Sequence, residues 1–449
     1  MCRVGGQIRI SIGLVVFETV ELVEYESRRV RTAAPSPDDL ALAERLAPRG
    51  DLDARITVRW LAGGFVDIAA SSWIGVVRFT NLEIRVVPKL VGDPLRVLRM
   101  LEYSGGVRLL AQLPIERRLP AHGSDLFELI VMLLVQETQT LIRDGLIRDY
   151  RSVDDALVVM RGRLRIREQF LQRYGSFHRL ECQFDEYDGD IPENQLLAAA
   201  LSAASRRIRD PELKSETHVL THMLAGACEP SARDTAWYRR RIQYGRRNDR
   251  YRSAHALATL VLDGLALTDL FSQSSGSASA FMLNMNVVFE RFVSRLVADS
   301  LTGSGLRVSA QESFGSVATD DVNGHSYTRI RPDLVIVEID SGRTVPIDIK
   351  YKLYSTKKFS PADIYQTFLY AYALSTDAEH ARAGLIYPST RMTDGPGLRV
   401  NRTAGSGLAH IRGFGLDVPS ALDTLGGTDE PALRENIVSA ILTITGFTT

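Results

Sequence analysis

Two short runs near the C-terminal end carry acidic and basic side chains at a spacing that suits metal-assisted chemistry. Residues 331–339 include Asp333, and residues 344–352 include Asp348 and Lys350. Two carboxylates can hold a hard cation through oxygen ligands; Mg2+ fits best, and Mn2+ is an alternative. Such a cation would polarise a phosphodiester and lower the pKa of a bound water, while Lys350 orients that water or offsets charge developing at phosphorus.

These side chains need a scaffold that brings them to one face, and a β-hairpin does so. Both runs are rich in β-branched residues, and residues 340–343 have the Asp, Ser and Gly composition of a turn. Pairing about the middle of this turn would set Asp333 opposite Lys350 and Val335 opposite Asp348. Because side chains alternate along a strand, the two acids and the lysine would share a face.

The pattern resembles the PD-(D/E)xK nuclease superfamily, with Pro332-Asp333 as its first half and Asp348-Ile349-Lys350 as its second. An amphipathic helix is expected over residues 286–301, and Glu290 lies beside its apolar face. The resemblance implies that Glu290 supplies a further contact to the metal or its water. An edge hairpin with solvated charges and an exposed helical glutamate are the alternative interpretations.

A second helix is expected to begin at residue 361 and to continue through residue 374. Gln366 and Tyr370 are one turn apart on this helix and share a face, so both could reach DNA or the site. We therefore treat Gln366 as a catalytic candidate and Tyr370 as a DNA-binding candidate, together with Lys352. A buried tyrosine and a glutamine near a helix start would produce the same pattern.

Length and composition bound the class of protein. The 449 residues are 45% hydrophobic, which suggests about three domains with real cores. Lys+Arg and Asp+Glu both total 54, so there is no global basic charge, and any DNA contact must be local or shared with a partner. Three scattered cysteines without CxxC spacing favour a reducing cytoplasm over a disulfide or zinc framework. Without a signal sequence or a long apolar stretch, we expect a cytoplasmic protein that does not contact membranes.

The periodicities divide the chain into three parts of a multidomain α+β protein. We expect a small β-rich partner-docking domain at residues 1–110, a mainly helical middle region at 111–270, and an α/β PD-(D/E)xK restriction-endonuclease-like domain at 271–449. A Ser-rich stretch at residues 271–281 is the expected linker before the last domain.

Individual elements follow from the same patterns. Expected strands lie at residues 7–18, 55–60, 65–70, 73–79, 82–87, 383–387 and 409–416. Expected helices lie at residues 38–46, with Ser36 or Asp38 as its cap, 95–103, 125–144, with Gly145 as its C-terminal cap, and 194–206. Glu18, Glu21 and Glu24 occur in an extended region without other catalytic residues, and we interpret them as solvated charges.

Arginines and aromatic residues alternate between residues 237 and 252. Basic side chains can bind a phosphate backbone and aromatic rings can stack on bases, so Arg246, Arg247, Arg250 and Tyr251 are DNA-binding candidates. A solvated arginine-rich face that is partly paired with acids is an equally good interpretation.

Taken in order, the motifs of the whole chain resemble the McrC family, the nuclease subunit of McrBC-type modification-dependent restriction systems. The resemblance is collinear over most of the chain. It rests on Ile74-Gly75-Val76, Ile84, Pro88-Lys89, Gly145-Leu146, Tyr150, Arg161-Gly162-Arg163-Leu164, Cys182 to Asp185, Asn194, Arg247-Asn248, Tyr251, Phe289-Glu290, Arg331-Pro332-Asp333, Asp348-Ile349-Lys350-Tyr351-Lys352 and Asp363-Ile364-Tyr365-Gln366.

The resemblance implies a partner and a division of labour. McrC-like proteins bind a separate AAA+ GTPase ring, McrB, which recognises modified DNA; the McrC-like subunit docks through its N-terminal part, stimulates nucleotide hydrolysis and cuts double-stranded DNA. By motif position, Asp333, Asp348 and Lys350 are the catalytic candidates, with Asp333, Asp348 and Glu290 as metal ligands. The sequence has no Gly-x-x-x-x-Gly-Lys-Ser/Thr loop, so we expect this chain to bind no nucleotide alone.

Two other functions fit the same features. The chain could be a non-catalytic assembly factor that activates a ring NTPase, in which case loss of both aspartates would leave partner activation unchanged. It could also be a standalone repair-type exonuclease, since such enzymes use a Gln-x-x-x-Tyr helix like that of Gln366 and Tyr370.

Overall fold

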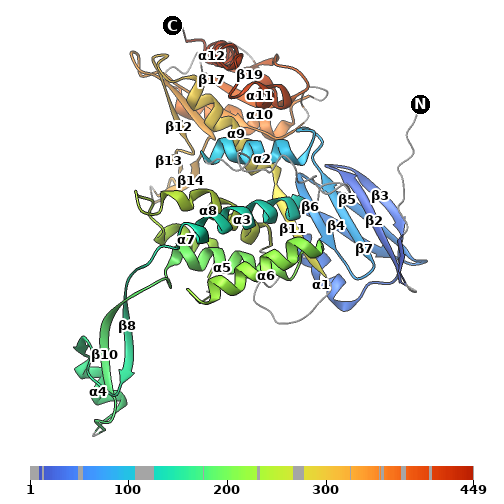
Figure 1. The fold of residues 1–449 in the computed structure, drawn as a ribbon. Helices are drawn as coiled ribbons and strands as arrows, with labels where there is room; N and C mark the ends of the chain where they lie inside the picture. The colour runs from blue at the N-terminus through green and yellow to red at the C-terminus, as the bar shows by residue number, and fades with distance from the viewer. Residues whose placement is uncertain are drawn as a thin grey trace.

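The computed structural model describes residues 10–12, 15–48, 54–106, 126–174, 176–229, 233–265, 278–323, 325–352, 354, 358–375, 381–403 and 407–447. Figure 1 shows β-sheets from the N-terminal part, a group of helices in the middle, a long projecting arm, and a second α/β layer at the C-terminal end. No helix in these ranges is both long and apolar enough to cross a membrane.

The N-terminal part is built from two small sheets. One has the order β1 (Ile10–Ile12), β2 (Val15–Val23), β7 (Leu82–Val87), β6 (Trp73–Arg78) and β11 (Ser279–Asn284), and the other the order β3 (Ser27–Arg31), β5 (Phe65–Ala70) and β4 (Ile56–Leu61). Helix α1 (Pro37–Leu46) begins at Ser36, whose hydroxyl accepts from the Asp39 backbone in a capping box. The expected strands at residues 55–60, 65–70, 73–79 and 82–87 and the expected helix are confirmed. The single strand expected at residues 7–18 is wrong, because β1 and β2 are two antiparallel strands in which Ile10 pairs with Phe17. Strand β3 is an additional strand.

Strand β11 joins the C-terminal part of the sequence to the N-terminal sheet. It pairs with β6 along its whole length, from Ser279 with Arg78 to Asn284 with Trp73. Gly75 permits this close pairing, because its φ is +139° and a Cβ would lie 2.1 Å from the Phe281 carbonyl oxygen. Residues 279–281, the last three of the expected linker, are therefore part of a strand of the first sheet, although they follow the expected domain boundary at residue 271. Residues 271–277 of the expected linker lie outside the described ranges.

The middle region is mainly helical, as expected. Helix α2 (Pro94–Gly105) precedes it, and its own helices include α3 (Leu126–Arg143), α5 (Pro192–Ser205), α6 (Pro211–Ala225), α7 (Thr235–Arg241), the 3-10 turn η1 (Asp249–Tyr251) and α8 (Arg252–Leu265). Gly145 follows α3 with φ +86°, the left-handed conformation that glycine adopts readily after a helix.

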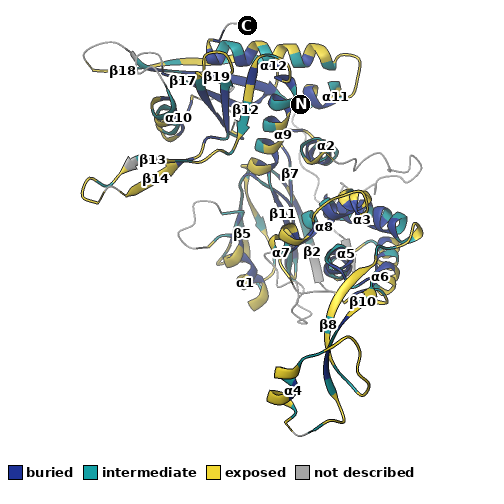
Figure 2. Ribbon diagram, turned by 90° about the vertical axis from the view of Figure 1, so that its left-hand side faces the viewer, coloured by how far each residue is buried: buried dark blue, intermediate teal, exposed yellow. Residues whose placement is uncertain are grey.

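A β-arm that the sequence patterns did not predict projects from these helices (Figures 1 and 2). It consists of β8 (Asp149–Leu157), β9 (Arg163–Leu164), α4 (Ile166–Gln172) and β10 (Leu180–Asp188). The two long strands pair antiparallel from Asp149 with Asp188 to Leu157 with Leu180. Much of the arm is exposed on both faces, so its sequence lacks the alternation that identifies a half-buried strand.

The C-terminal part is a mixed six-stranded sheet between helices, in agreement with the expected α/β architecture. The strand order is β12 (Leu306–Ala310), β15 (Leu334–Glu338), β16 (Thr344–Ile349), β17 (Ala381–Ser389), β19 (Gly407–Asp417) and β18 (Thr393–Asn401). The helices are α9 (Met285–Ser300), α10 (Pro361–Leu374), α11 (Val418–Thr424) and α12 (Glu430–Thr445); α10 and α12 lie on opposite sides of the sheet (Figure 2). A hairpin of β13 (Phe314–Thr319) and β14 (Ser326–Ile330) extends from it.

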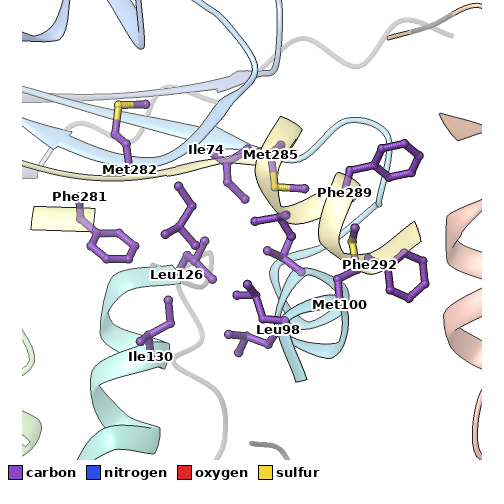
Figure 3. Packing of buried hydrophobic residues seen from close by; sticks show 14 of the residues in the cluster. Ile74, Leu98, Met100, Leu126, Ile130, Phe281, Met282, Met285, Phe289 and Phe292 are labelled. Atoms are coloured by element: carbon purple, nitrogen blue, oxygen red, sulfur yellow. The ribbon is translucent and has the colours of Figure 1, made fainter. Parts of the chain in front are cut away.

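One continuous hydrophobic core connects the three parts. Figure 3 shows where they meet: Ile74 of β6, Leu98 of α2, Leu126 of α3, Phe281 of β11 and Phe289 of α9 lie in one cluster. Because such cores are close-packed, a displacement of the N-terminal sheet relative to α9 would disturb this cluster.

Candidate active site

The expected hairpin exists, but its register differs by two residues from the expected one. Leu334 pairs with Ile347, so Asp333, one step further, faces Asp348 rather than Lys350. The reason is the turn: Glu338 N donates to Arg343 O at 2.9 Å and closes a four-residue loop, whose last residue, Gly342, has φ +69°. A shift of two residues keeps every side chain on its expected face.

This register brings the two aspartates together at the end of the strand pair. Asp333 directly precedes β15, and its Oδ2 accepts a hydrogen bond from the Ile349 amide at 2.6 Å. Asp348 is buried near the end of β16. Ile347 and Ile349, on the other face of the strand, lie in the core, so packing fixes the direction in which Asp348 points.

Lys350 completes the expected triad. Its Nζ lies 3.0 Å from Asp348 Oδ2, and its backbone amide donates to Ile386 O of β17 at 2.9 Å. Burial alone would lower the pKa of Lys350, but the carboxylates of Asp348, Asp333 and Asp363 together outweigh burial and the net pKa is raised. The lysine therefore stays protonated beside the aspartates.

Glu290 joins the site through Gln311, which sequence reasoning missed. The Gln311 side-chain amide donates to Glu290 Oε1 and lies 3.3 Å from Asp333 Oδ1. Gln311 directly follows β12, and its backbone amide donates to Asp333 O at 2.9 Å. No short-range motif marks this glutamine; its position next to the aspartate depends on the pairing of β12 with β15.

Gln366 and Tyr370 of α10 are hydrogen-bonded to each other, and Tyr370 reaches the segment that precedes Asp333. Gln366 Nε2 donates to Tyr370 OH at 2.8 Å, and Tyr370 OH lies 3.5 Å from Arg331 O. Burial raises the pKa of the Tyr370 phenol, and the charges of Asp348 and Asp333 add to the rise. The expected pair on one helix face is therefore adjacent to the aspartates.

Lys352 is held at the start of α10. Its Nζ lies 3.0 and 2.8 Å from the two carboxylate oxygens of buried Asp363, which also accepts from Tyr354 OH and, at 2.6 Å, from Ser360 Oγ. This network ties the motif strand to α10. The lysine side chain remains half exposed, and its charge is already paired.

The two aspartates fit a divalent cation. Burial raises the pKa of Asp348, Lys350 opposes that rise, and the charge of Asp333 adds to it; burial likewise raises the pKa of Asp333. Asp348 Oδ2 forms the ion pair with Lys350 but receives no well-aligned hydrogen bond from the described residues. A cation bound between the two carboxylates would offset their mutual repulsion and occupy their free acceptor positions.

These carboxylates do not form a complete metal shell by themselves. In the described ranges, no three Asp, Glu, His or Cys side chains converge closely enough to hold a metal ion. Mg2+ is commonly held by one or two carboxylates, with water and phosphate oxygens as its other ligands. Asp333 and Asp348 could be such a pair, with Glu290 behind them.

The arginine-rich segment lies apart from this cluster, among the helices at the base of the arm. The three candidate arginines, Arg246, Arg247 and Arg250, are all exposed. Arg247 donates to Arg148 O at 2.8 Å and pairs with Asp149, and Arg250 donates to Gly145 O. Arg247 therefore holds the start of β8, and Arg250 holds the segment directly after α3. Both agree with the alternative interpretation that the arginines are partly paired with acids.

The proposal that Tyr251 stacks on DNA bases is wrong for this arrangement. Tyr251 is fully buried; its hydroxyl accepts from the Ile147 amide at 2.9 Å and donates to Asn194 Oδ1 at 3.1 Å. Its ring is therefore part of the helical core and cannot contact a base.

The interpretation of Glu24 as a solvated charge is also wrong. Glu24 is completely buried, and its Oε2 accepts from the Lys89 amide and from Tyr351 OH, each at 2.8 Å. Burial raises its pKa to about 7, against the hydrogen bonds from Lys89 and Tyr351. Tyr351, one of these two partners, follows Lys350 directly in sequence, and no local sequence pattern indicates that it contacts Glu24.

The fold and site define a class: a multidomain α/β protein whose C-terminal mixed sheet carries a cluster of two aspartates and a lysine at adjoining strand ends. A sequence model of the family described as McrBC 5-methylcytosine restriction system component matches residues 68–388. The chain belongs to this family, which confirms the resemblance drawn from its motifs.

Two of the solved structures that match this chain are from Thermococcus gammatolerans. A chain in the refined half-complex from the tetradecameric assembly of Thermococcus gammatolerans McrB AAA+ hexamers with bound McrC matches with a TM-score of 0.59 and 18% identity, covering 95% of this chain and 100% of that chain. A chain in the cryo-EM structure of the T. gammatolerans McrBC complex matches with a TM-score of 0.42 and 20% identity, covering 63% and 88%. No curated protein matches this sequence.

Proposed function

We propose that this chain is the DNA-cleaving subunit of a McrBC-like restriction complex and hydrolyses phosphodiester bonds with Mg2+. The observation that carries the proposal is the placement of Asp333 opposite Asp348, with Lys350 3.0 Å from the second aspartate. A purely structural hairpin has no need of two crowded carboxylates at its buried end, because their desolvation is costly.

The chemistry follows from the groups that this chain supplies. Asp333 and Asp348 would hold Mg2+, which, when bound, supplies a Lewis acid that polarises the phosphodiester and favours deprotonation of water. Lys350 keeps its positive charge beside the scissile phosphate, where it orients the attacking water and offsets charge in the transition state. Attack in line with the leaving oxygen then cleaves the backbone without a covalent enzyme intermediate.

Glu290 and Gln366 would act around this centre. Burial raises the pKa of Glu290, so its carboxylate can hold or accept a proton next to the attacking water, while Gln311 fixes its direction. Gln366, bonded to Tyr370, presents a polar edge from α10 towards the same region. In this proposal, β12, β15, β16 and β17 with α9 and α10 form the PD-(D/E)xK domain.

A partner of the AAA+ class would supply nucleotide hydrolysis and recognise modified DNA, and this chain would stimulate that hydrolysis. The support is family membership together with the similar assembly from T. gammatolerans, in which McrC is bound to McrB AAA+ hexamers. We place the docking surface at the tip of the arm rather than in the expected N-terminal domain, because the tip exposes large apolar residues. They are Val158, Val159, Ile166, Phe170, Leu171, Tyr174 and Phe177.

The decisive test is Asp348→Ala in the assembled complex. We expect Mg2+-dependent cleavage of modified plasmid DNA to fall to the level of a metal-free control, because one of two metal ligands is lost, while binding to the ring partner is retained. The matched control is Asp340→Ala, which removes an exposed aspartate from the turn of the same hairpin. Cleavage by Asp348→Ala at the wild-type rate would disprove the assignment.

The same variants separate cleavage from assembly. If Asp333→Ala/Asp348→Ala stimulates the partner's nucleotide hydrolysis as wild type does, and wild type shows no metal-dependent nicking, the chain is an assembly factor. Stimulation retained with cleavage lost only in the variant is the result that we expect.

A further inference from the structure

Tyr351, the residue after Lys350, is held at both ends by the N-terminal part of the chain. Its hydroxyl donates to Glu24 Oε2 at 2.8 Å, and its backbone carbonyl accepts from Tyr25 OH at 3.1 Å. Its ring is buried and packs against Phe289 of α9, with 5.5 Å between ring centroids. Two consecutive residues, far earlier in the sequence, thus contact one residue of the catalytic motif.

Glu24 and Tyr25, the N-terminal residues of this contact, are held by hydrogen bonds of their own. Glu24 follows β2, donates its amide to Val87 O at 3.3 Å, and accepts from the Lys89 amide at 2.8 Å. Tyr25 has φ +63°, a left-handed conformation that a bulky residue rarely adopts, and it donates its amide to Ser71 O at 3.3 Å. Contacts to two neighbouring segments, residues 87–89 and Ser71, therefore hold the pair in this unusual geometry.

In the C-terminal part, Tyr351 directly follows the segment that carries the Asp348–Lys350 ion pair. Asp348 belongs to β16, whereas Lys350 and Tyr351 follow the end of that strand. The Lys350 amide is bonded to Ile386 O, so the next fixed point along the chain is Tyr351. The anchors that follow Tyr351 are the Lys352 amide, which donates to Lys350 O at 2.9 Å, and the Lys352 side chain, which is bonded to Asp363. Release of Tyr351 would remove the anchor nearest to Lys350, and Lys350 Nζ would lose its fixed distance to Asp348.

We propose that Tyr351 is a positioning residue for Lys350, and that Glu24 and Tyr25 are the N-terminal residues that hold it in place. The proposal deepens the proposed function and rests on it. It assigns a task to the N-terminal part, because the end of β2 fixes the lysine that faces the scissile phosphate. A displacement of a catalytic group by about one ångström is enough to slow an enzyme greatly.

The test removes single hydroxyl groups. Tyr351→Phe keeps the ring and the carbonyl and loses only the bond to Glu24. The matched control is Tyr103→Phe: the Tyr103 hydroxyl donates to Asp299 at 2.8 Å, and its ring packs against Phe292 of the same helix α9. Single-turnover cleavage of modified plasmid is measured in the preassembled complex at varied DNA and Mg2+ concentrations, with thermal unfolding measured in parallel.

We expect Tyr351→Phe to lower the maximal cleavage rate about tenfold, with little change in the DNA concentration at half-maximal rate, while Tyr103→Phe cleaves like wild type. Glu24→Gln, which keeps an acceptor oxygen, should cleave faster than Glu24→Ala. Tyr25→Phe should also lower the rate, since it frees the Tyr351 carbonyl.

A wild-type rate for Tyr351→Phe would overturn the proposal. So would equal rate losses in Tyr351→Phe and Tyr103→Phe, since that result would indicate a general effect on packing. Asp348→Ala is included in each series: if it still cleaves, the proposed function fails, and if it is inactive while Tyr351→Phe is fully active, only the positioning role fails.

Discussion

Backbone strain in this protein is concentrated beside the proposed catalytic residues. Among the described residues, Tyr25 and Gln311 are the two non-glycine residues with positive φ, at +63° and +55°. Each conformation costs about 1–2 kcal/mol for an ordinary side chain. One residue contacts Tyr351 and the other contacts Asp333, so the surrounding structure maintains strain where side chains must be held in place.

Gln311 provides a direct test of that interpretation. In Gln311→Gly, relief of the positive φ offsets the added freedom of the unfolded chain, so we expect the free energy of unfolding to change by less than about 1 kcal/mol. Loss of the amide that connects Glu290 and Asp333 should lower the cleavage rate about tenfold. Denaturant unfolding and single-turnover cleavage measure the two effects, and cleavage at the wild-type rate would show that Gln311 is not needed.

Glu24 predicts a pH dependence of stability. Its pKa in the folded protein is about 7, above its ordinary value of 4.5, so the folded state binds the proton more tightly than the unfolded state. The stabilisation from this proton is complete below pH 4.5 and is lost as the pH rises towards 7; it amounts to about 3 kcal/mol at most. Glu24→Gln lacks this titration. The stability of wild type relative to Glu24→Gln should therefore fall between about pH 5 and pH 8, and a constant difference in denaturant unfolding would contradict this.

Among the elements, the hairpin was predictable because its information is local. Asp333, Asp348 and Lys350 are carried by two runs of β-branched residues with a turn between them, and alternation alone assigns their common face. The register was not predictable, because it depends on which residue of the turn adopts positive φ, and Gly342 does so. Gln311 and Glu24 were missed for a different reason: their partners lie 22 and 327 positions away in sequence.

The β-arm is the element for which partner binding is the natural test. Leu171 and Tyr174 near its tip are 72% and 86% exposed. We expect Leu171→Ser/Tyr174→Ser to leave thermal stability unchanged and to weaken binding to the AAA+ partner at least about tenfold, because buried apolar contacts dominate such interfaces. Val322→Ser/Tyr327→Ser on the β13–β14 hairpin is the matched control, since those side chains are 96% and 80% exposed. Equal affinities of the two variants would exclude the tip as a docking surface.

At the scale of the whole molecule, the shared core argues that the three parts unfold together. Phe281 of β11 packs against Phe127 of α3, with 5.1 Å between ring centroids, and Gly264 of α8 leaves room for its ring. Phe281→Ala should lower the free energy of unfolding by about 3–5 kcal/mol, since it opens a cavity where all three parts meet.

Two spectroscopic signals can show whether Phe281→Ala destabilises all three parts of the molecule. The three tryptophans, Trp60, Trp73 and Trp237, all precede α9, whereas far-UV circular dichroism also reports the C-terminal helices and sheet. If one core joins the parts, denaturant unfolding followed by fluorescence and by circular dichroism should coincide in wild type, and both curves should shift together in Phe281→Ala. Two separate transitions, with only the fluorescence curve shifted, would mean that the C-terminal part is stable alone, and the path from Glu24 to Lys350 would then join two independent domains.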